Sequence, residues 1–228
     1  TGSEKGKAYS YSVNTTAGFS IVKYIGNGTS GHTIPHHLGF GPDIILVKQL
    51  STSRDWQVYV KNWTYGAGAF LELNLTNSWA SNANRWNNTD TTSTVFTLGD
   101  GDGTNQNDED YVAYCWAEKT GYSKFGYYVG NGNADGPFIY TGFKPTFVML
   151  KNASDGESGD EWFMEDATRS PYNPTGKKLS ANLNNAETAA SWVDLDFLSN
   201  GFKIRTSDAG LNESGKNYIY MAFGQSLV

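Results

Sequence analysis

The sequence of 228 residues contains one cysteine and few charged side chains. The single Cys115 excludes an internal disulfide framework and any zinc site built from cysteines. Basic side chains number 17 against 23 acidic ones, for a formal charge of −6, which argues against nucleic acid as the main partner. No apolar run approaches the roughly 20 residues that a membrane helix needs, and no signal peptide opens the chain, so we expect no membrane insertion.

Common catalytic patterns are also missing from the sequence. There is no Gly-x-Ser-x-Gly elbow, no His-Glu-x-x-His motif, no phosphate-binding loop and no dinucleotide fingerprint. A β-sandwich glycosidase needs two carboxylates aimed at one glycosidic bond, and the densest acidic segment, 160–166, lacks the Glu-x-Asp-x-x-Glu spacing of laminarinase-type enzymes. We therefore predict a protein that is not an enzyme. A polysaccharide depolymerase that uses Glu161 or Glu165 is kept as an alternative.

Aromatic residues and glycines are plentiful, at 14% of the chain and 26 residues, which is typical of short strands joined by tight turns. Alternating patterns and short apolar runs predict strands at residues 19–25, 44–47, 56–60, 94–98, 111–117, 147–150, 201–205 and 218–223. Asn27-Gly28 and Asn131-Gly132 predict turns, because this pair tolerates a positive φ. One short helix is expected at residues 186–192.

The chain also repeats itself. Tyr24-Ile-Gly-Asn-Gly28 recurs 104 positions later as Tyr128-Val-Gly-Asn-Gly132, and further matches follow in the same order: Pro42 to Lys48 with Pro145 to Lys151, Asp55-Trp56 with Glu161-Trp162, and Tyr111 with Tyr218. We predict an all-β fold of two tandem, internally duplicated β-sandwich units, jelly-roll or concanavalin-like, packed together. The expected boundaries are 1–17 for an N-terminal linker or strand, 18–120 for the first unit and 121–228 for the second. Cys115 corresponds to Ala222, which predicts a small buried residue.

Features that occur in one copy only are candidates for an added binding surface. The first copy has tryptophans interleaved with asparagine and arginine, and the second copy has no clear counterparts. An exposed indole can stack on the C–H face of a sugar while neighbouring polar groups bind its hydroxyls. The alternative is that these indoles plug the ends of the sandwich under long loops. The candidate ligand-binding residues are Trp63, Trp79, Arg85, Trp86 and Asn77.

A second such feature is the acidic, glycine-rich loop at residues 100–110. Alternating carboxylate and amide oxygens are typical calcium ligands, and the candidates are Asp100, Asp102, Asn105 and Asp108. The spacing departs from the helical calcium loop at Thr104, and a solvated acidic hairpin is the alternative interpretation. All three histidines lie at residues 32–37, where Pro35 and the flanking glycines predict a loop leading into a strand rather than a helical metal site.

The ordered motifs of the two copies carry a family resemblance. They include His36-His-Leu-Gly-Phe-Gly-Pro-Asp43, Tyr111-Val-Ala-Tyr-Cys-Trp-Ala-Glu118, Gly121-Tyr-Ser-Lys-Phe-Gly126, Thr141-Gly-Phe-Lys-Pro145 and Leu198-Ser-Asn-Gly-Phe-Lys-Ile-Arg205. In these motifs the chain resembles an uncharacterised repeat family of virion and tail-fibre proteins of tailed bacteriophages, many of them marine. The resemblance implies a structural or adhesive role on the surface of a virus particle, and it brings no established catalytic residues.

Together these features predict a non-enzymatic phage virion module that binds host-surface glycan. Its expected partners are host polysaccharide and other virion proteins. Analogy with fibre proteins, which are often trimers, suggests a homotrimer. A purely structural capsid-decoration or fibre-shaft protein is the main alternative. Beyond the calcium that the acidic loop would hold, no cofactor is expected.

Overall fold

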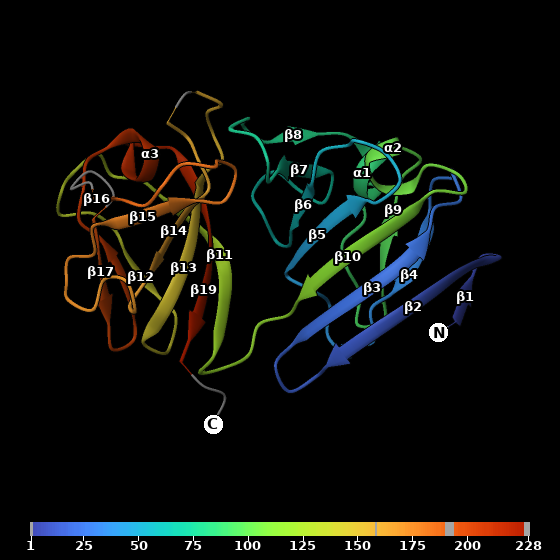
Figure 1. Ribbon diagram of the computed structural model, residues 1–228, viewed down its shortest axis with the longest axis horizontal. Helices are drawn as coiled ribbons and strands as arrows, with labels where there is room; N and C mark the ends of the chain where they lie inside the picture. The colour runs from blue at the N-terminus through green and yellow to red at the C-terminus, as the bar shows by residue number, and fades with distance from the viewer. Residues whose placement is uncertain (1, 158, 190–193, 226–228) are drawn as a thin grey trace. The chain divides into compact units, whose positions relative to one another are not determined.

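The structure is a computed structural model that describes residues 2–157, 159–189 and 194–225 (Figure 1). Contacts between Cα atoms divide the chain into two compact units. The first comprises Thr1–Leu73 and Trp79–Glu118, and the second comprises Asn74–Ser78 and Lys119–Val228. Antiparallel strands make up most of the regular structure, and none of the helices in the described ranges is long and apolar enough to cross a membrane.

The first unit is built on a sheet with the strand order β1-β2-β3-β10-β5-β6-β7-β8. These strands are β1 (Gly2–Glu4), β2 (Lys7–Asn14), β3 (Phe19–Ile25), β5 (Ile44–Gln49), β6 (Gln57–Val60), β7 (Ala69–Glu72), β8 (Ala80–Ser81) and β10 (Asp110–Trp116). A small second sheet pairs β4 (His32–Pro35) with β9 (Val95–Leu98), and α1 (Ala83–Trp86) and α2 (Asp102–Asn105) are single helical turns. Buried side chains from both sheets form one core.

Strand β10 shows why the sequence places this core where it does. It lies between β3 and β5, so neighbours on both sides satisfy its backbone hydrogen bonds. Its alternate residues Tyr111, Ala113 and Cys115 are fully buried in the core, while the residues between them are half-buried on the other face. Cys115 is therefore the small buried residue that the repeat predicts, and burial raises the pKa of its thiol.

The second unit combines a six-stranded and a three-stranded sheet around a core of its own. The larger sheet has the order β11-β19-β13-β14-β15-β16, with β11 (Ser123–Val129), β13 (Pro145–Asn152), β14 (Phe163–Asp166), β15 (Lys177–Ser180), β16 (Thr188–Ala189) and β19 (Asn217–Gly224). The smaller has the order β12-β18-β17, with β12 (Phe138–Tyr140), β17 (Leu195–Leu198) and β18 (Gly201–Ile204). The single turn α3 (Ala209–Asn212) precedes β19.

The large sheets of the two units share one strand order. Taken in turn, β3, β10, β5, β6, β7 and β8 hold the places that β11, β19, β13, β14, β15 and β16 hold in the second unit. The correspondence extends to side chains. The rings of Tyr24 and Tyr111 stack at 5.2 Å and 11°, and those of Tyr128 and Tyr218 stack at 5.1 Å and 13°.

Each unit also has strands that the other lacks. Among the described residues, only the first unit has the N-terminal hairpin β1–β2, in which β2 pairs along the whole of β3. Strand β11, which takes the place of β3 in the second unit, ends its sheet. Conversely, β17 lengthens the small sheet of the second unit to three strands.

Several local expectations need correction. The helix expected at residues 186–192 is wrong over its described part, because Thr188–Ala189 forms β16 against β15, and residues 190–192 lie outside the described residues. Residues His32–Pro35 form a strand rather than a loop, since β9 supplies their hydrogen-bond partners. Gly28 and Gly132 have the predicted positive φ, at 64° and 67°. Their turns do not join two strands of one sheet, because each connects a strand of the large sheet to a strand of the small sheet.

Candidate functional site

One buried asparagine in each unit fixes the single-turn helix that precedes the central strand. In the first unit, Asn105 accepts hydrogen bonds from the backbone N–H of Asn27 and from Nδ1–H of His32, both at 2.9 Å. Its amide Nδ2 donates to the carbonyl oxygens of Thr29 (3.1 Å) and Gly99 (2.6 Å). Because both ends of this amide are occupied, Asn105 is a structural clasp that holds α2 against the loop after β3.

The second unit has the same clasp. Asn212 is fully buried, and its Oδ1 accepts from the backbone N–H of Asn131 at 2.8 Å. Its Nδ2 donates to the carbonyl oxygens of Asn133 and Thr206, both at 2.7 Å. This arrangement fixes α3 beside the end of β13. A polar pocket lies next to the clasped helix in each unit.

The pocket of the first unit has a volume of about 470 Å³ and is lined by Arg54, Asp55, Gln57, Asn84, Arg85, Asp100, Gly101, Asp102 and Gly103. Arg85 is held in place by a hydrogen bond from its Nε to Gln57 Oε1 at 2.9 Å, and its guanidinium lies 5.2 Å from the ring centroid of Phe70. A Cβ atom at Gly101 would lie 2.7 Å from a terminal nitrogen of Arg85, so glycine there leaves room for the guanidinium. Arg54 is oriented by an ion pair with Asp102 at 2.8 Å.

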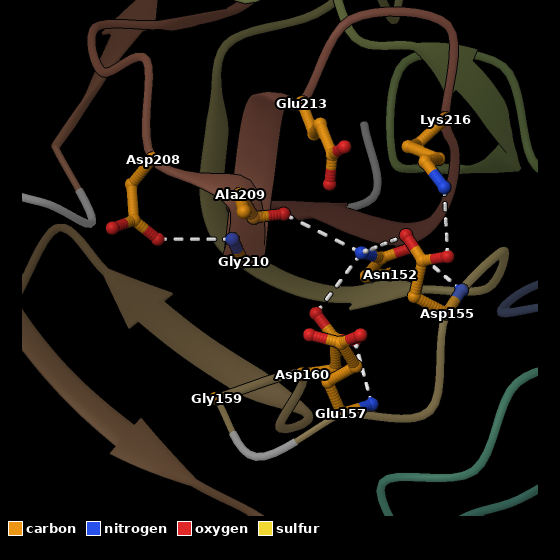
Figure 2. Close-up of a pocket in the computed structure, with 10 residues that line it drawn as sticks. All are labelled: Asn152, Asp155, Glu157, Gly159, Asp160, Asp208, Ala209, Gly210, Glu213 and Lys216. Carbon is orange, nitrogen blue, oxygen red and sulfur yellow. Dashed lines mark hydrogen bonds and ion pairs between the residues drawn. The ribbon is translucent and has the colours of Figure 1, made fainter.

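The pocket of the second unit has a similar volume, about 460 Å³, but a more acidic lining (Figure 2). Its lining residues are Asn152, Asp155, Glu157, Gly159, Asp160, Asp208, Ala209, Gly210, Glu213 and Lys216. Five carboxylates face a single ammonium group, whereas the first pocket sets three carboxylates against two guanidinium groups. The two pockets therefore occupy comparable places with different electrostatics.

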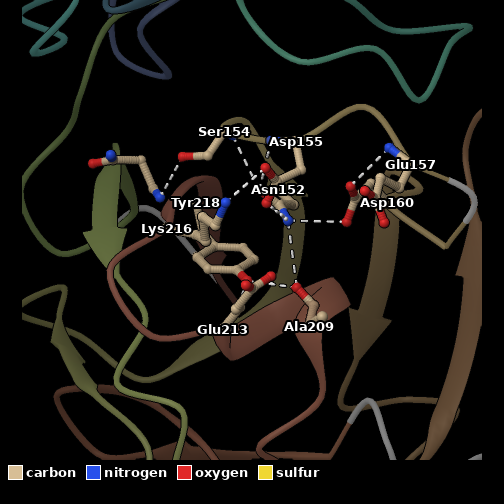
Figure 3. Close-up of polar contacts among 10 residues, drawn as sticks. Asn152, Ser154, Asp155, Glu157, Asp160, Ala209, Glu213, Lys216 and Tyr218 are labelled. Carbon is tan, nitrogen blue, oxygen red and sulfur yellow. Dashed lines mark hydrogen bonds and ion pairs between the residues drawn. The ribbon is translucent and has the colours of Figure 1, made fainter.

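Hydrogen bonds within the second pocket use most of its polar groups (Figure 3). Asn152, at the end of β13, donates from Nδ2 to Asp160 Oδ1 at 2.9 Å and accepts from the backbone N–H of Ser154 at 3.0 Å. Lys216 donates to Asp155 at 2.8 Å, and this hydrogen bond raises the pKa of Lys216. Asp208 caps α3 by accepting from the backbone N–H of Gly210 at 2.9 Å. Most of these carboxylates therefore hold the protein itself together.

The structure distributes the five candidate ligand-binding residues unevenly. Trp63 and Trp86 are only 4% and 1% exposed, and Trp86 belongs to the core of the first unit, so neither ring face is open to a sugar. Trp79 is half-buried and stacks on Tyr65 at 3.9 Å and 11°. Asn77 is exposed but belongs to the second unit. Arg85 alone among the five lines one of the two pockets beside the clasped helices.

The four candidate calcium ligands are not gathered around one point. Asp100 and Asp102 line the first pocket, Asn105 is committed to the clasp, and the exposed Asp108 forms an ion pair with Lys7. Within the described ranges, no cluster of three or more His, Cys, Asp or Glu side chains is placed to hold a metal ion. The loop also differs from a solvated hairpin, because α2 forms within it and Thr104 and Asn105 are buried.

Sequence reasoning missed part of the first pocket, and it touched the second only through Asp160, which lies in the acidic segment 160–166. Arg54, Gln57 and Asn84 carried no motif, and the residues around Asn152 lie in a stretch with no recognised pattern. The repeat itself points to both pockets. Each pocket takes lining residues from the segment after the lysine that ends the apolar run, Lys48 in the first copy and Lys151 in the second.

Glu165 and Glu161, the carboxylates of the depolymerase alternative, occupy different environments. Glu165 is fully buried on β14, and neither of its carboxyl oxygens has a hydrogen-bond partner in the described structure. Burial raises the pKa of Glu165 to about 8, and the neighbouring side chain of Thr175 opposes this rise. Glu161 accepts a hydrogen bond from the side chain of Asn182. Neither residue lines the two pockets described above.

These observations define a β-rich protein whose antiparallel sheets form two units, each with a polar pocket. The chain belongs to a family described as a domain of unknown function (DUF7483), which matches residues 4–226 and therefore nearly the whole sequence. Comparison with curated proteins and with solved structures found no match.

Proposed function

We propose that this protein is a non-enzymatic module of a bacteriophage particle that binds host-surface glycan in the pocket of its first unit. The observation that carries the proposal is the lining of that pocket. Arg85, anchored by Gln57, lies in the same lining as Asp100 and Asn84. Guanidinium, carboxylate and amide groups in one pocket can donate to and accept from the hydroxyls of a sugar ring.

The size and rigidity of the pocket support the same proposal. A volume of about 470 Å³ falls within the usual range for small-molecule sites. Arg85 and Arg54 are each held by a neighbouring side chain, so binding orders few additional groups. Polar contacts of this kind bind a single sugar weakly, and many copies on one particle multiply the affinity.

The proposed protein consists of two copies of one β-sandwich unit that have diverged at their pockets. The shared strand order, the paired tyrosine stacks and the two asparagine clasps support this view. The divergence is electrostatic. Arg54 and Arg85 line the first pocket, while Lys216 is the only basic residue in the lining of the second. We assign the sugar to the first pocket because two guanidinium groups line it, whereas Asn152 and Lys216 of the second pocket already donate to the carboxylates of that pocket.

A purely structural virion protein is the second candidate. The burial of Trp63 and Trp86 favours it, because these indoles pack inside the first unit as the plugging alternative predicts. In that case other virion proteins are the partners, and the purified chain binds no polysaccharide.

Substituting one acid of the first pocket tests the proposal. Asp100 is exposed and lines the pocket, and Asp108 is exposed on the same loop outside it, so Asp100→Asn and Asp108→Asn remove equal charge. We expect Asp100→Asn to weaken glycan binding by about fivefold, because a hydrogen bond to a charged acceptor becomes one to a neutral acceptor. The measurement is calorimetric titration with a polysaccharide first identified on a glycan array.

Asp108→Asn should bind like the unmodified chain, since the φ of 62° at this position suits asparagine. Equal loss of affinity in the two variants would mean that the charge of the protein, and not a contact in the first pocket, determines glycan binding. No binding by the folded chain to any bacterial surface polysaccharide on the array would reject the proposed function itself.

A further inference from the structure

Arg85 lines the first pocket with the end of its side chain uncommitted. Its Nε donates to Gln57 Oε1 at 2.9 Å, and neither terminal nitrogen of its guanidinium has a hydrogen-bond or ion-pair partner among the described residues. The other guanidinium of this lining differs, since Arg54 pairs with Asp102 at 2.8 Å. Asp100 shares the lining and forms no ion pair with Arg85 in the part of the chain that the structure describes. The first pocket therefore offers a cation whose outer donors are available to a ligand.

Contacts with the inner part of this guanidinium hold it in place. Its central carbon lies 5.2 Å from the ring centroid of Phe70. A Cβ atom at Gly101 would lie 2.7 Å from Nη1 of Arg85, and one at Gly103 would lie 3.3 Å from its Nε, so both glycines make room for the group. The backbone N–H of Gly99 donates to Arg85 O at 3.0 Å and ties this loop to α1. Because the guanidinium is already placed, a ligand that binds it orders little of the protein.

The second unit has a carboxylate where the first unit has this guanidinium. Gly101 and Asp208 each precede the clasp asparagine of their unit by four residues, and each is the N-cap of its single-turn helix. Asp208 caps α3 by accepting from the backbone N–H of Gly210 at 2.9 Å. Gly101 has no side chain to cap α2, and Arg85 lies where that side chain would begin. The two pockets therefore differ in charge at one equivalent position.

We propose, on the basis of the glycan-binding function proposed above, that the sugar in the first pocket is an acidic one and that Arg85 binds its carboxylate. The two terminal nitrogens of a guanidinium present parallel N–H donors that match the two oxygens of a carboxylate. Nε of Arg85 is already bonded to Gln57, so the two terminal nitrogens form this fork. Asp100 remains as an acceptor for a ring hydroxyl. Arg85 thereby selects glycans that contain uronic acid over neutral ones.

The net charge of the chain makes this selection a local property. At −6, the protein as a whole repels a polyanion, so general attraction does not explain a preference for an acidic polysaccharide over its neutral form. Such a preference reports a contact between the carboxylate and a group in the binding site.

Titration of the full, unmodified chain with one polysaccharide in two forms tests the proposal. The probe is the uronic-acid polysaccharide that binds best on the glycan array, used as isolated and after reduction of its carboxyl groups to alcohols. We expect the reduction to weaken binding at least about tenfold, because Arg85 then loses a charged acceptor.

Variants of two arginines assign the effect to the first pocket. Arg85→Gln should weaken binding of the acidic form by at least about tenfold and change binding of the reduced form by less than about threefold. Arg205→Gln is the matched control, because it removes the same charge at an exposed side chain that lines neither pocket. It should bind both forms like the unmodified chain.

The possible results separate the acidic sugar from glycan binding itself. Equal affinity for the two forms, with Asp100→Asn still weakening both, would overturn the assignment of a carboxylate to Arg85 and leave glycan binding in place. A polymer of neutral sugars joined by phosphodiesters that binds as tightly as the acidic polysaccharide, and that also requires Arg85, would overturn it in favour of phosphate. No binding of either form by the folded chain would reject the proposed function.

Discussion

Replacing Glu165 with glutamine should remove a contribution that lowers the stability of the protein as the pH rises from 5 to 8, while the histidines, whose pKa values are lowered, keep their opposite contribution. The free energy of unfolding of the unmodified chain should fall over this range by roughly 3 to 5 kcal/mol through Glu165. Burial of the carboxyl raises the pKa of Glu165 from 4.5 to about 8. Since both oxygens lack a hydrogen-bond partner in the described structure, ionisation places a buried charge without a hydrogen-bond donor in the second unit.

The sign of this effect follows from proton binding. Between pH 4.5 and 8 the folded chain keeps the proton of Glu165 and the unfolded chain has released it, so the folded state loses stability as the pH rises. Arg169 lowers the pKa, while Asp166 and Asp194 raise it further. Glu165→Gln carries no ionisable group and removes this dependence.

Denaturant unfolding at pH 5 and pH 8 measures the effect as the difference between the two proteins. Glu213→Gln is the control, because Glu213 is exposed and the variant should retain the pH dependence of the unmodified chain. If Glu165→Gln and the unmodified chain lost the same stability between these two pH values, Glu165 would not be buried in its neutral form.

Removing either asparagine clasp should destabilise the protein by about 2 to 4 kcal/mol. Asn105→Ala and Asn212→Ala each delete a fully buried amide, which bonds to the loop after β3 in the first unit and after β11 in the second. A typical hydrogen bond contributes about 1 kcal/mol net, and buried partners left unsatisfied add to the loss. Each substitution should also expose its own loop to hydrogen exchange, near Gly28 in one variant and near Gly132 in the other.

The two substitutions together test whether the units share one design. Similar losses in denaturant unfolding are expected, because the two clasps make the same bonds apart from the one that Asn105 accepts from His32. Asn184→Ala, at an exposed position, should change the stability by less than about 0.5 kcal/mol. A neutral effect of one clasp substitution beside a large effect of the other would mean that the two loops are held in different ways.

The sequence predicts the strands of this fold well where apolar alternation is strong. The expected strand at residues 19–25 coincides with β3, and the runs beginning at Ile44 and Phe147 lie within the central strands β5 and β13. It fails where tertiary pairing decides the structure. Thr188–Ala189 has no strand pattern of its own and becomes β16 only because β15 lies beside it.

The candidate site was harder to predict than the fold. Tryptophan density indicated a sugar-binding surface, but Trp86 packs edge-on against Tyr59 at 5.5 Å in the core. Sequence alone does not distinguish an indole that fills a core from one that faces a ligand. Arg85 and Asp100 were named for different reasons, as a glycan contact and a calcium ligand, and backbone hydrogen bonds from Gly99 to Arg85 and from Gly101 to Asn84 bring both into one pocket.

Nuclear magnetic resonance titration with surface oligosaccharide tests the central claim, that the first pocket binds sugar, most directly. The account predicts shift changes at the backbone amides of Gly101 and Gly103 and at Nε of Arg85, all of which belong to residues lining that pocket. The amide of Gly210, in the pocket of the second unit, should not respond. Changes confined to Gly210 and its neighbours, or a spectrum that no bacterial surface oligosaccharide alters, would contradict it.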